Sequence, residues 1–211
     1  MPRPSNTQER RRQIADALVK VMARRGYDGA SVAGIAKAAR LTPGLVHYHF
    51  ESKQEILLAA LDELVARHDA RLDARLRAAG DDDPHAQVAA FIDFHLGVGA
   101  DADPEALACW VLISGEALRE PKVRTGFQAA LAGMSARLTA IIQRGVERRV
   151  FTSAAPEPAA AALLAAIQGY FVVAATARAL IPRGSAAAAT KRMAEGLLRP
   201  RRHFPGPEVR S

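Results

Sequence analysis

The sequence contains a single cysteine, Cys109, so no disulfide can form within the chain. Cys109 stands beside Trp110 in an apolar run, which fits a reducing compartment, and we expect a cytoplasmic protein. No apolar segment of the kind found in signal peptides follows the arginine-rich residues 1–12, so export is not expected. The longest apolar stretches, such as residues 159–167, fall short of the roughly 18 residues of a membrane span. The sequence therefore predicts a soluble protein.

Enzyme motifs are missing as well. The chain has no glycine-rich phosphate loop, no nucleophile elbow and no cysteine pair. His68, Asp69, His95 and the acidic run 81–83 are metal ligands in type, but none forms a paired arrangement on one helix face. Because no nucleophile, base and orienting group can be assembled from these motifs, we expect neither catalysis nor a bound metal or cofactor.

Charge is distributed unevenly along the chain, whose formal net charge is +7. Residues 1–53 hold ten Lys or Arg against four Asp or Glu (+6), residues 54–182 hold twelve against sixteen (−4), and residues 183–211 hold seven against two (+5). A basic head on an acidic body is typical of a protein whose head binds a polyanion. Ordinary surface solubilisation would give the same charge balance, so charge alone does not decide.

Alanine is abundant, residues that favour β-strands are sparse, and apolar residues recur every three or four positions. This pattern predicts an all-α fold. Proline, glycine and capping residues mark the boundaries of helices expected at residues 7–25, 32–39, 43–49, 53–79, 84–98, 104–118, 121–149, 156–181 and 186–198. Prolines and arginines dominate residues 199–211, which we expect to form a disordered basic tail.

Two short helices near the N-terminus have clear start signals. Ser31 is placed to cap the first, and Thr42 the second, with Pro43 at the first helical position, where its missing N–H does no harm. A helix, a short helix, a tight turn and a second short helix make the helix-turn-helix, whose last helix enters the major groove of DNA. On that helix Gly44 allows close backbone approach, and Tyr48 offers a donor to phosphate.

The same segment resembles the DNA-binding domain of TetR-family regulators. The resemblance rests on GYDGASV at residues 26–32, IAKAA at 35–39, LTPGLVHYHF at 41–50 and SKQEILL at 52–58. It implies that Val46 and Phe50 are core residues. It also implies that the contacts to DNA come from exposed residues of the two short helices and the start of the next: Ser31, Thr42, Pro43, Gly44, His47, Tyr48, His49 and Lys53. In the family the Tyr-His-Phe run usually follows Leu-Tyr, whereas this chain has Val46-His47.

Several of these assignments have alternatives. Ser31 can be purely a helix cap, and both histidines can be exposed polar residues at a helix end. The arginines at 10–12 can lie along the DNA backbone or in the minor groove, or can belong to a disordered arm.

The body is expected to form a homodimer. One short recognition helix reads few bases, so such domains act as symmetric dimers on palindromes. The helices expected at residues 121–149 and 156–181 carry apolar residues on more than one face, together with small residues that allow close helix approach. As the TetR resemblance implies, they would form a four-helix dimer interface; alternatively they fill only the core of their own chain.

The body more distantly resembles the C-terminal domain of the choline-responsive betaine-pathway branch of TetR regulators. The likeness rests on Trp110, the Glu-Ala-Leu run at 116–118, Pro121 and the Gly-Tyr pair at 169–170, and implies a sensor fold. The candidate ligand-binding residues combine aromatic rings with a few polar groups: Phe91, Phe94, His95, Trp110, Ser114 and Tyr170. Each could equally be an ordinary core residue.

Together these features predict a one-component transcriptional regulator, acting as a repressor, with a small-molecule effector and double-stranded operator DNA as partners. We expect a DNA-binding domain at residues 1–53, a ligand-binding and dimerisation domain at 54–198, and the tail at 199–211. The helix expected at residues 53–79 would carry the signal between the two domains. The alternative is a DNA-binding protein without a sensor, which would share every feature of residues 1–53.

Overall fold

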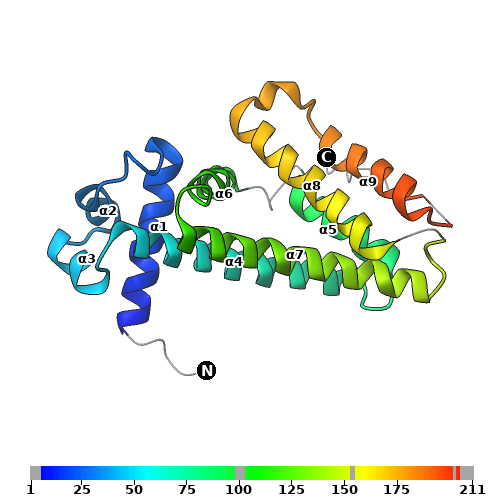
Figure 1. Cartoon of the computed structure of the whole chain (residues 1–211), viewed down its shortest axis with the longest axis horizontal. Coiled ribbons are helices and arrows are strands. Elements are labelled where there is room, and N and C mark those ends of the chain that lie inside the picture. Colours follow the sequence, from blue (N-terminus) through cyan, green and yellow to red (C-terminus); the bar gives the residue numbers. More distant parts are fainter. Residues whose placement is uncertain (1–5, 98–102, 153–154, 202, 205–211) are drawn as a thin grey trace. The chain divides into compact units, whose positions relative to one another are not determined.

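The computed structural model describes residues 6–97, 103–152, 155–201 and 203–204. Over these residues the regular structure is helical, apart from one isolated β-bridge between Phe151 and Pro200, so the all-α prediction is confirmed. The α-helices, labelled in Figure 1, are α1 (Asn6–Arg25), α2 (Val32–Ala39), α3 (Pro43–His49), α4 (Lys53–Ala78), α5 (Pro84–Leu96), α6 (Pro104–Glu116), α7 (Pro121–Glu147), α8 (Pro156–Thr176) and α9 (Ser185–Leu198), with a short 3₁₀-helix η1 (Arg178–Leu180).

The chain divides by packing into two compact units. Unit 1 comprises Met1–His68 and Asp103–Ala130, and unit 2 comprises Asp69–Ala102 and Leu131–Ser211. The division falls inside α4 and inside α7, and α6 belongs to unit 1 with the N-terminal helices. The functional division at residue 53 stays a prediction, since a unit defined by packing need not coincide with a unit defined by role.

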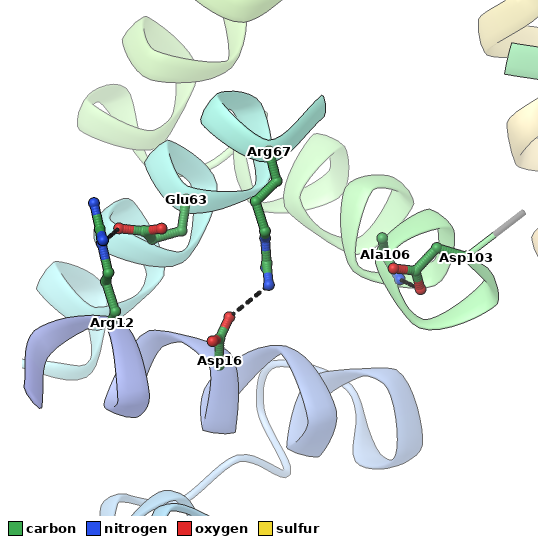
Figure 2. Close-up of polar contacts among 6 residues, drawn as sticks. All are labelled: Arg12, Asp16, Glu63, Arg67, Asp103 and Ala106. Carbon is green, nitrogen blue, oxygen red and sulfur yellow. Dashed lines mark hydrogen bonds and ion pairs between the residues drawn. The ribbon is translucent and has the colours of Figure 1, made fainter. Parts of the chain in front are cut away.

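Proline and aspartate set the starts of α5 and α6. Each helix has a proline in its first turn and an aspartate as N-cap: the Asp83 carboxylate accepts the Ala86 N–H at 3.0 Å, and that of Asp103 accepts the Ala106 N–H at 2.9 Å (Figure 2). Such a cap satisfies one otherwise unpaired N–H and stabilises a helix by about 1 kcal/mol. These local signals explain why sequence alone located both starts correctly.

Five helix ends fall earlier than expected, and those of α4 at Ala78 and α5 at Leu96 do so by only one and two residues. Helix α6 ends at Glu116 and α7 at Glu147, while α8 ends at Thr176 because Ala177 takes an extended φ of −145° and the chain continues as η1. The expected end of the fifth helix, at position 98, lies outside the described residues.

Unit 1 is built around α1, against which α2 and α3 pack (Figure 1). The apolar side of α1 is fully buried at Ile14, Leu18 and Met22. Two ion pairs then connect α1 to α4: Arg12 Nε lies 2.8 Å from Glu63 Oε1, and Arg67 Nη1 lies 2.9 Å from Asp16 Oδ1 (Figure 2). These side chains are 28–59% exposed, so the pairs orient α1 and α4 more than they stabilise the fold.

Unit 2 has its own core, contributed by α5, α8, α9 and the parts of α4 and α7 that it contains. Its buried members include Leu72, Phe91, Leu138, Leu163 and Leu198. One ion pair is nearly dry: Lys191 Nζ on α9 lies 2.6 Å from Asp93 Oδ2 on α5, and the Lys191 side chain is 4% exposed. A buried cation of this kind is tolerated only when it is paired, so this contact fixes α9 against α5.

The start of the basic tail is ordered, which corrects the expectation of disorder from residue 199. Phe204 is buried, its ring stacks on His85 with centroids 4.2 Å apart, and its N–H donates to Glu195 Oε1 at 2.9 Å. That hydrogen bond is the main reason why the pKa of the Glu195 carboxyl lies below its ordinary value. Composition predicted disorder because this segment is rich in proline and arginine, and the single aromatic residue Phe204 does not change that prediction. Positions 202 and 205–211 lie outside the described residues.

Gly145 marks a close approach between the end of α7 and the ring of Phe151. A Cβ at Gly145 would overlap carbons of that ring, which is itself buried. We therefore expect Gly145→Ala to lower the free energy of unfolding by about 1–3 kcal/mol, the usual cost of overpacking a core. Urea denaturation would measure it. Gly196→Ala is the matched control, because a Cβ at Gly196 meets nothing within 4 Å; equal losses in both variants would contradict the argument.

Among the described residues, α8 is long and apolar enough to cross a membrane by length and composition alone. Only 28% of its most apolar stretch is buried in this structure, although Leu163 and Ile167 lie in the core of unit 2. This stretch was not expected from the sequence, because Gln168 and Gly169 interrupt its run of apolar residues. Much of the apolar surface of α8 is therefore uncovered in the single chain.

Candidate DNA-binding surface

Local hydrogen bonds fix the ends of the two short helices. Ser31 Oγ accepts the Gly34 N–H at 3.1 Å, and Thr42 Oγ1 accepts the Leu45 N–H at 3.3 Å, so both capping predictions are confirmed. Between the helices, Arg40 takes a left-handed conformation with φ of 57° and ψ of 41°, and its N–H bonds to carbonyls of α2. This conformation costs a non-glycine residue some energy, and it makes the turn that redirects the chain into α3.

Helix α3 has a buried side and an exposed side, as an element that reads DNA requires. Val46 and Phe50 are 1% and 2% exposed and belong to the core, as expected. Tyr48 is 80% exposed, with its ring edge-on to His49 at 5.1 Å. A large aromatic side chain left in solvent gains nothing from the fold and remains available to a partner. The predicted contact residues on the same surface that are also exposed are Ser31, Thr42, Pro43, Gly44 and His47.

Arg40 is a further candidate, which was not among the contact residues predicted from sequence. It is exposed on the turn two residues before Thr42, next to the start of α3. Lys37, one turn earlier on α2, is exposed too. These cations would face the same polyanion as α3. A basic residue in the turn between the two short helices could have been noted from sequence, because that turn always borders the reading helix.

Lys53 is held differently from the other candidates. Its ammonium donates to the Tyr27 carbonyl at 2.9 Å and lies 4.1 Å from the centre of the Tyr27 ring. Burial, followed by the charges of Glu116, Glu120 and Asp28, raises the pKa of the Tyr27 hydroxyl. One of the three ammonium donors of Lys53 is thus used within unit 1. Its contact with phosphate stays a prediction.

The arginines at 10–12 lie in α1, so the alternative of a disordered arm is wrong. Arg10 donates to Gln13 Oε1 at 2.7 Å, Arg12 pairs with Glu63, and Arg11 donates to the carbonyl of His49 at the end of α3. Each is therefore engaged within the protein.

The six candidate ligand-binding residues fall into both units. In unit 2, the rings of Phe91 and Phe94 lie 4.4 and 5.1 Å from that of His95, whose Nδ1 is 2.7 Å from the Phe91 carbonyl. Tyr170 is half-buried beside the same core. Trp110 and Ser114 belong to unit 1, where the Trp110 ring packs 4.5 Å from that of Phe127 and the Ser114 hydroxyl donates to the Val111 carbonyl. The positions of these six residues in the sequence could not show that they belong to two different units.

Unit 1 also holds the single cysteine of the chain. Burial raises the pKa of the Cys109 thiol to about 12, with the nearby charge of Arg67 acting in the opposite direction. The thiol therefore stays protonated, and it lacks the thiolate character of a nucleophile. Over the described residues, no group of three or more His, Cys, Asp or Glu side chains is arranged to hold a metal ion.

Two family models match the chain. Residues 14–60 match the model described as bacterial regulatory proteins of the tetR family, and residues 84–199 match that of the BetI-type transcriptional repressor, C-terminal. Curated relatives include the HTH-type transcriptional regulator BetI of Rhizobium meliloti, 30% identical over 124 residues, and that of Brucella canis, 31% identical over 111 residues. These matches cover 59% and 53% of the chain, and the chain spans 60% and 54% of the two relatives.

Solved structures agree with the family models. A transcriptional regulator from Rhodococcus sp. Rha1 is 27% identical and superimposes with a TM-score of 0.78, covering 90% of this chain and 96% of that one. A transcriptional regulator from Saccharomonospora viridis in complex with choline is 25% identical, with a TM-score of 0.76 and coverage of 90% and 95%. The family and these relatives are transcriptional regulators rather than enzymes. The chain therefore belongs to the TetR family of DNA-binding transcriptional regulators and is related to its BetI branch.

Proposed function

We propose that this protein is a homodimeric one-component repressor that binds a palindromic operator in the cytoplasm and is released by a small molecule. The observation that carries the proposal is the exposed side of α3, where Tyr48 is left in solvent while Val46 and Phe50 anchor the helix to the core. A rigid helix with exposed polar groups can enter the major groove and contact both phosphates and base edges.

Uncharged surfaces on α7 and α8 support the homodimer. Within unit 2, exposed residues recur along one face of each helix at spacings of three and four, and they are small or uncharged up to Gln143 on α7, where Glu147 follows at the helix end. On α7 they are Ala132, Ala136, Ala140 and Gln143, and on α8 they are Ala162, Ala165, Gly169, Val172 and Thr176. Small residues at this spacing let two helices approach closely. A second copy of the chain would cover the apolar surface that α8 leaves exposed.

An aromatic cluster in unit 2 supports a cationic effector. The rings of Phe91, Phe94, His95 and Phe171 lie near one another on α5 and α8, and the guanidinium of Arg71 lies 5.7 Å from the Phe94 ring centre. Aromatic faces attract quaternary ammonium groups in the same way as they attract guanidinium. Because the Saccharomonospora viridis relative was solved with choline, choline is the first compound to test.

Selection from a random DNA library tests the operator. We expect the native chain to enrich an inverted repeat with half-sites about 34–36 Å apart or a multiple of that distance, as the two-fold symmetry of a dimer requires. Binding to the selected site should weaken steeply with salt, by about 0.9 log unit per log salt for each phosphate neutralised. If the folded protein enriches no sequence, the proposed function is wrong.

Titration of choline into the complex with the selected DNA tests the effector. We expect release of the DNA, and we expect Phe94→Ala to raise the choline concentration required by about fivefold, since one aromatic face is worth roughly 1 kcal/mol to a bound cation. The same substitution should leave operator binding without choline unchanged. A complex that choline leaves intact would contradict this effector and would favour the alternative of a DNA-binding protein without a sensor.

A further inference from the structure

Helix α3 is too short to hold its own position. It has seven residues, about two turns, and an isolated helix of that length is unstable in water. Its last carbonyl groups have no partner within the helix. The Phe50 N–H donates to the Val46 carbonyl at 3.0 Å. The neighbouring carbonyls, including that of His49, therefore need hydrogen-bond donors from elsewhere in the fold.

Arg11 supplies the missing partner from α1. Its Nη1 donates to the His49 carbonyl, and its guanidinium carbon lies 4.0 Å from the centre of the Phe50 ring. Phe50 is buried, whereas Arg11 is half-buried. The cation therefore contacts the last turn of α3 twice, at a backbone carbonyl and at a core ring, and its charge faces the negative end of the helix dipole.

Gln13 makes a similar hydrogen bond to the C-terminal end of α2. Its side-chain amide donates to the Ala39 carbonyl at 2.7 Å, at the C-terminal end of α2, while its own carbonyl accepts from Arg10 at 2.7 Å. Two side chains of α1, two positions apart, thus hold the C-terminal ends of the two short helices. The contact from Arg11 reaches the end of α3, and the contact from Gln13 reaches the end of α2.

We propose that Arg11 is a positioning residue that fixes the recognition helix from its buried side, rather than a residue that contacts DNA phosphate. The inference rests on the proposed DNA-binding function. Loss of a positioning residue should weaken the contacts to base edges, because those contacts require exact placement of α3. It should affect binding to DNA of arbitrary sequence much less, because that binding depends on charge.

The test compares Arg11→Gln with Arg25→Gln, an equal loss of charge at an exposed arginine at the other end of α1. We expect Arg11→Gln to bind the selected operator about tenfold or more weakly than Arg25→Gln does. Affinity for a scrambled duplex should be the same in both variants. The slope of log affinity against log salt should also match, whereas loss of a phosphate contact would reduce it by about 0.9 per half-site.

Two outcomes would overturn the proposal: an equal loss on operator and scrambled DNA with a reduced salt slope, or no loss on the operator. Both affinities are measured well below the unfolding temperature of each variant. If Arg11→Gln fails to fold, Arg11→Lys replaces it, because lysine keeps the positive charge but lacks the planar guanidinium group.

Hydrogen exchange gives a readout that does not depend on DNA. We expect Arg11→Gln to speed exchange of the α3 amides, including that of Phe50, while the amides of α1 keep their native rates. Unchanged α3 exchange would contradict the anchoring contact, even if the native chain enriches no operator and the proposed function itself fails.

Discussion

Ala165→Arg is expected to convert the protein from a dimer to a monomer and to lower its affinity for the full operator by about 10²–10³-fold. Ala165 is exposed in the middle of the uncharged face of α8, between Ala162 and Gly169. An arginine there would bring two charged side chains into the close helix contact that the small residues allow. In a dimer, binding of one subunit holds the other near the second half-site at an effective concentration in the millimolar range. A monomer loses this advantage.

The fold of the single chain should survive this substitution. Position 165 is exposed in the chain itself, and arginine is nearly as good a helix former as alanine. Ala74→Arg makes the same change at an exposed position on α4 and serves as the control. Sedimentation should give twice the 22.6 kDa chain mass for the native protein and for Ala74→Arg, and the single mass for Ala165→Arg. A dimeric Ala165→Arg would place the interface elsewhere.

Sequence alone located the helices well because their signals are local. Ser31, Thr42, Asp83 and Asp103 each cap a helix through a contact only three residues away. A residue type at such a short spacing nearly determines the hydrogen bond. The helix-turn-helix could therefore be predicted from residues 26–58, and the comparisons with known proteins agree with it.

The contacts that sequence missed join residues far apart in the chain. Arg11 and His49 are separated by 38 positions, and Lys53 and Tyr27 by 26. Neither contact follows from the type of residue, since an arginine or lysine in a basic segment is equally compatible with bound phosphate. The burial of Phe204 and the place of Trp110 in unit 1 were missed for the same reason. The packing partners of a side chain are set by the fold rather than by its neighbours in sequence.

Tyr48→Ala is expected to weaken operator binding by about tenfold per half-site, and so by about a hundredfold for the dimer. A hydrogen bond to a charged group is worth roughly 1.5–3 kcal/mol, and 1.4 kcal/mol corresponds to a factor of ten. Because Tyr48 is 80% exposed, the free energy of unfolding should change by less than about 0.5 kcal/mol. Tyr48→Phe keeps the ring and should reproduce most of the loss if the hydroxyl contacts phosphate.

The salt dependence separates this role from that of a charged contact. Tyr48 is neutral when it donates, so Tyr48→Ala should shift the line of log affinity against log salt without changing its slope. Lys53→Gln should reduce the slope by about 0.9 per half-site if the ammonium leaves Tyr27 for a phosphate. If it stays on the Tyr27 carbonyl, where the structure places it, the slope should remain native. Full operator affinity in Tyr48→Ala would mean that α3 does not present this side chain to DNA.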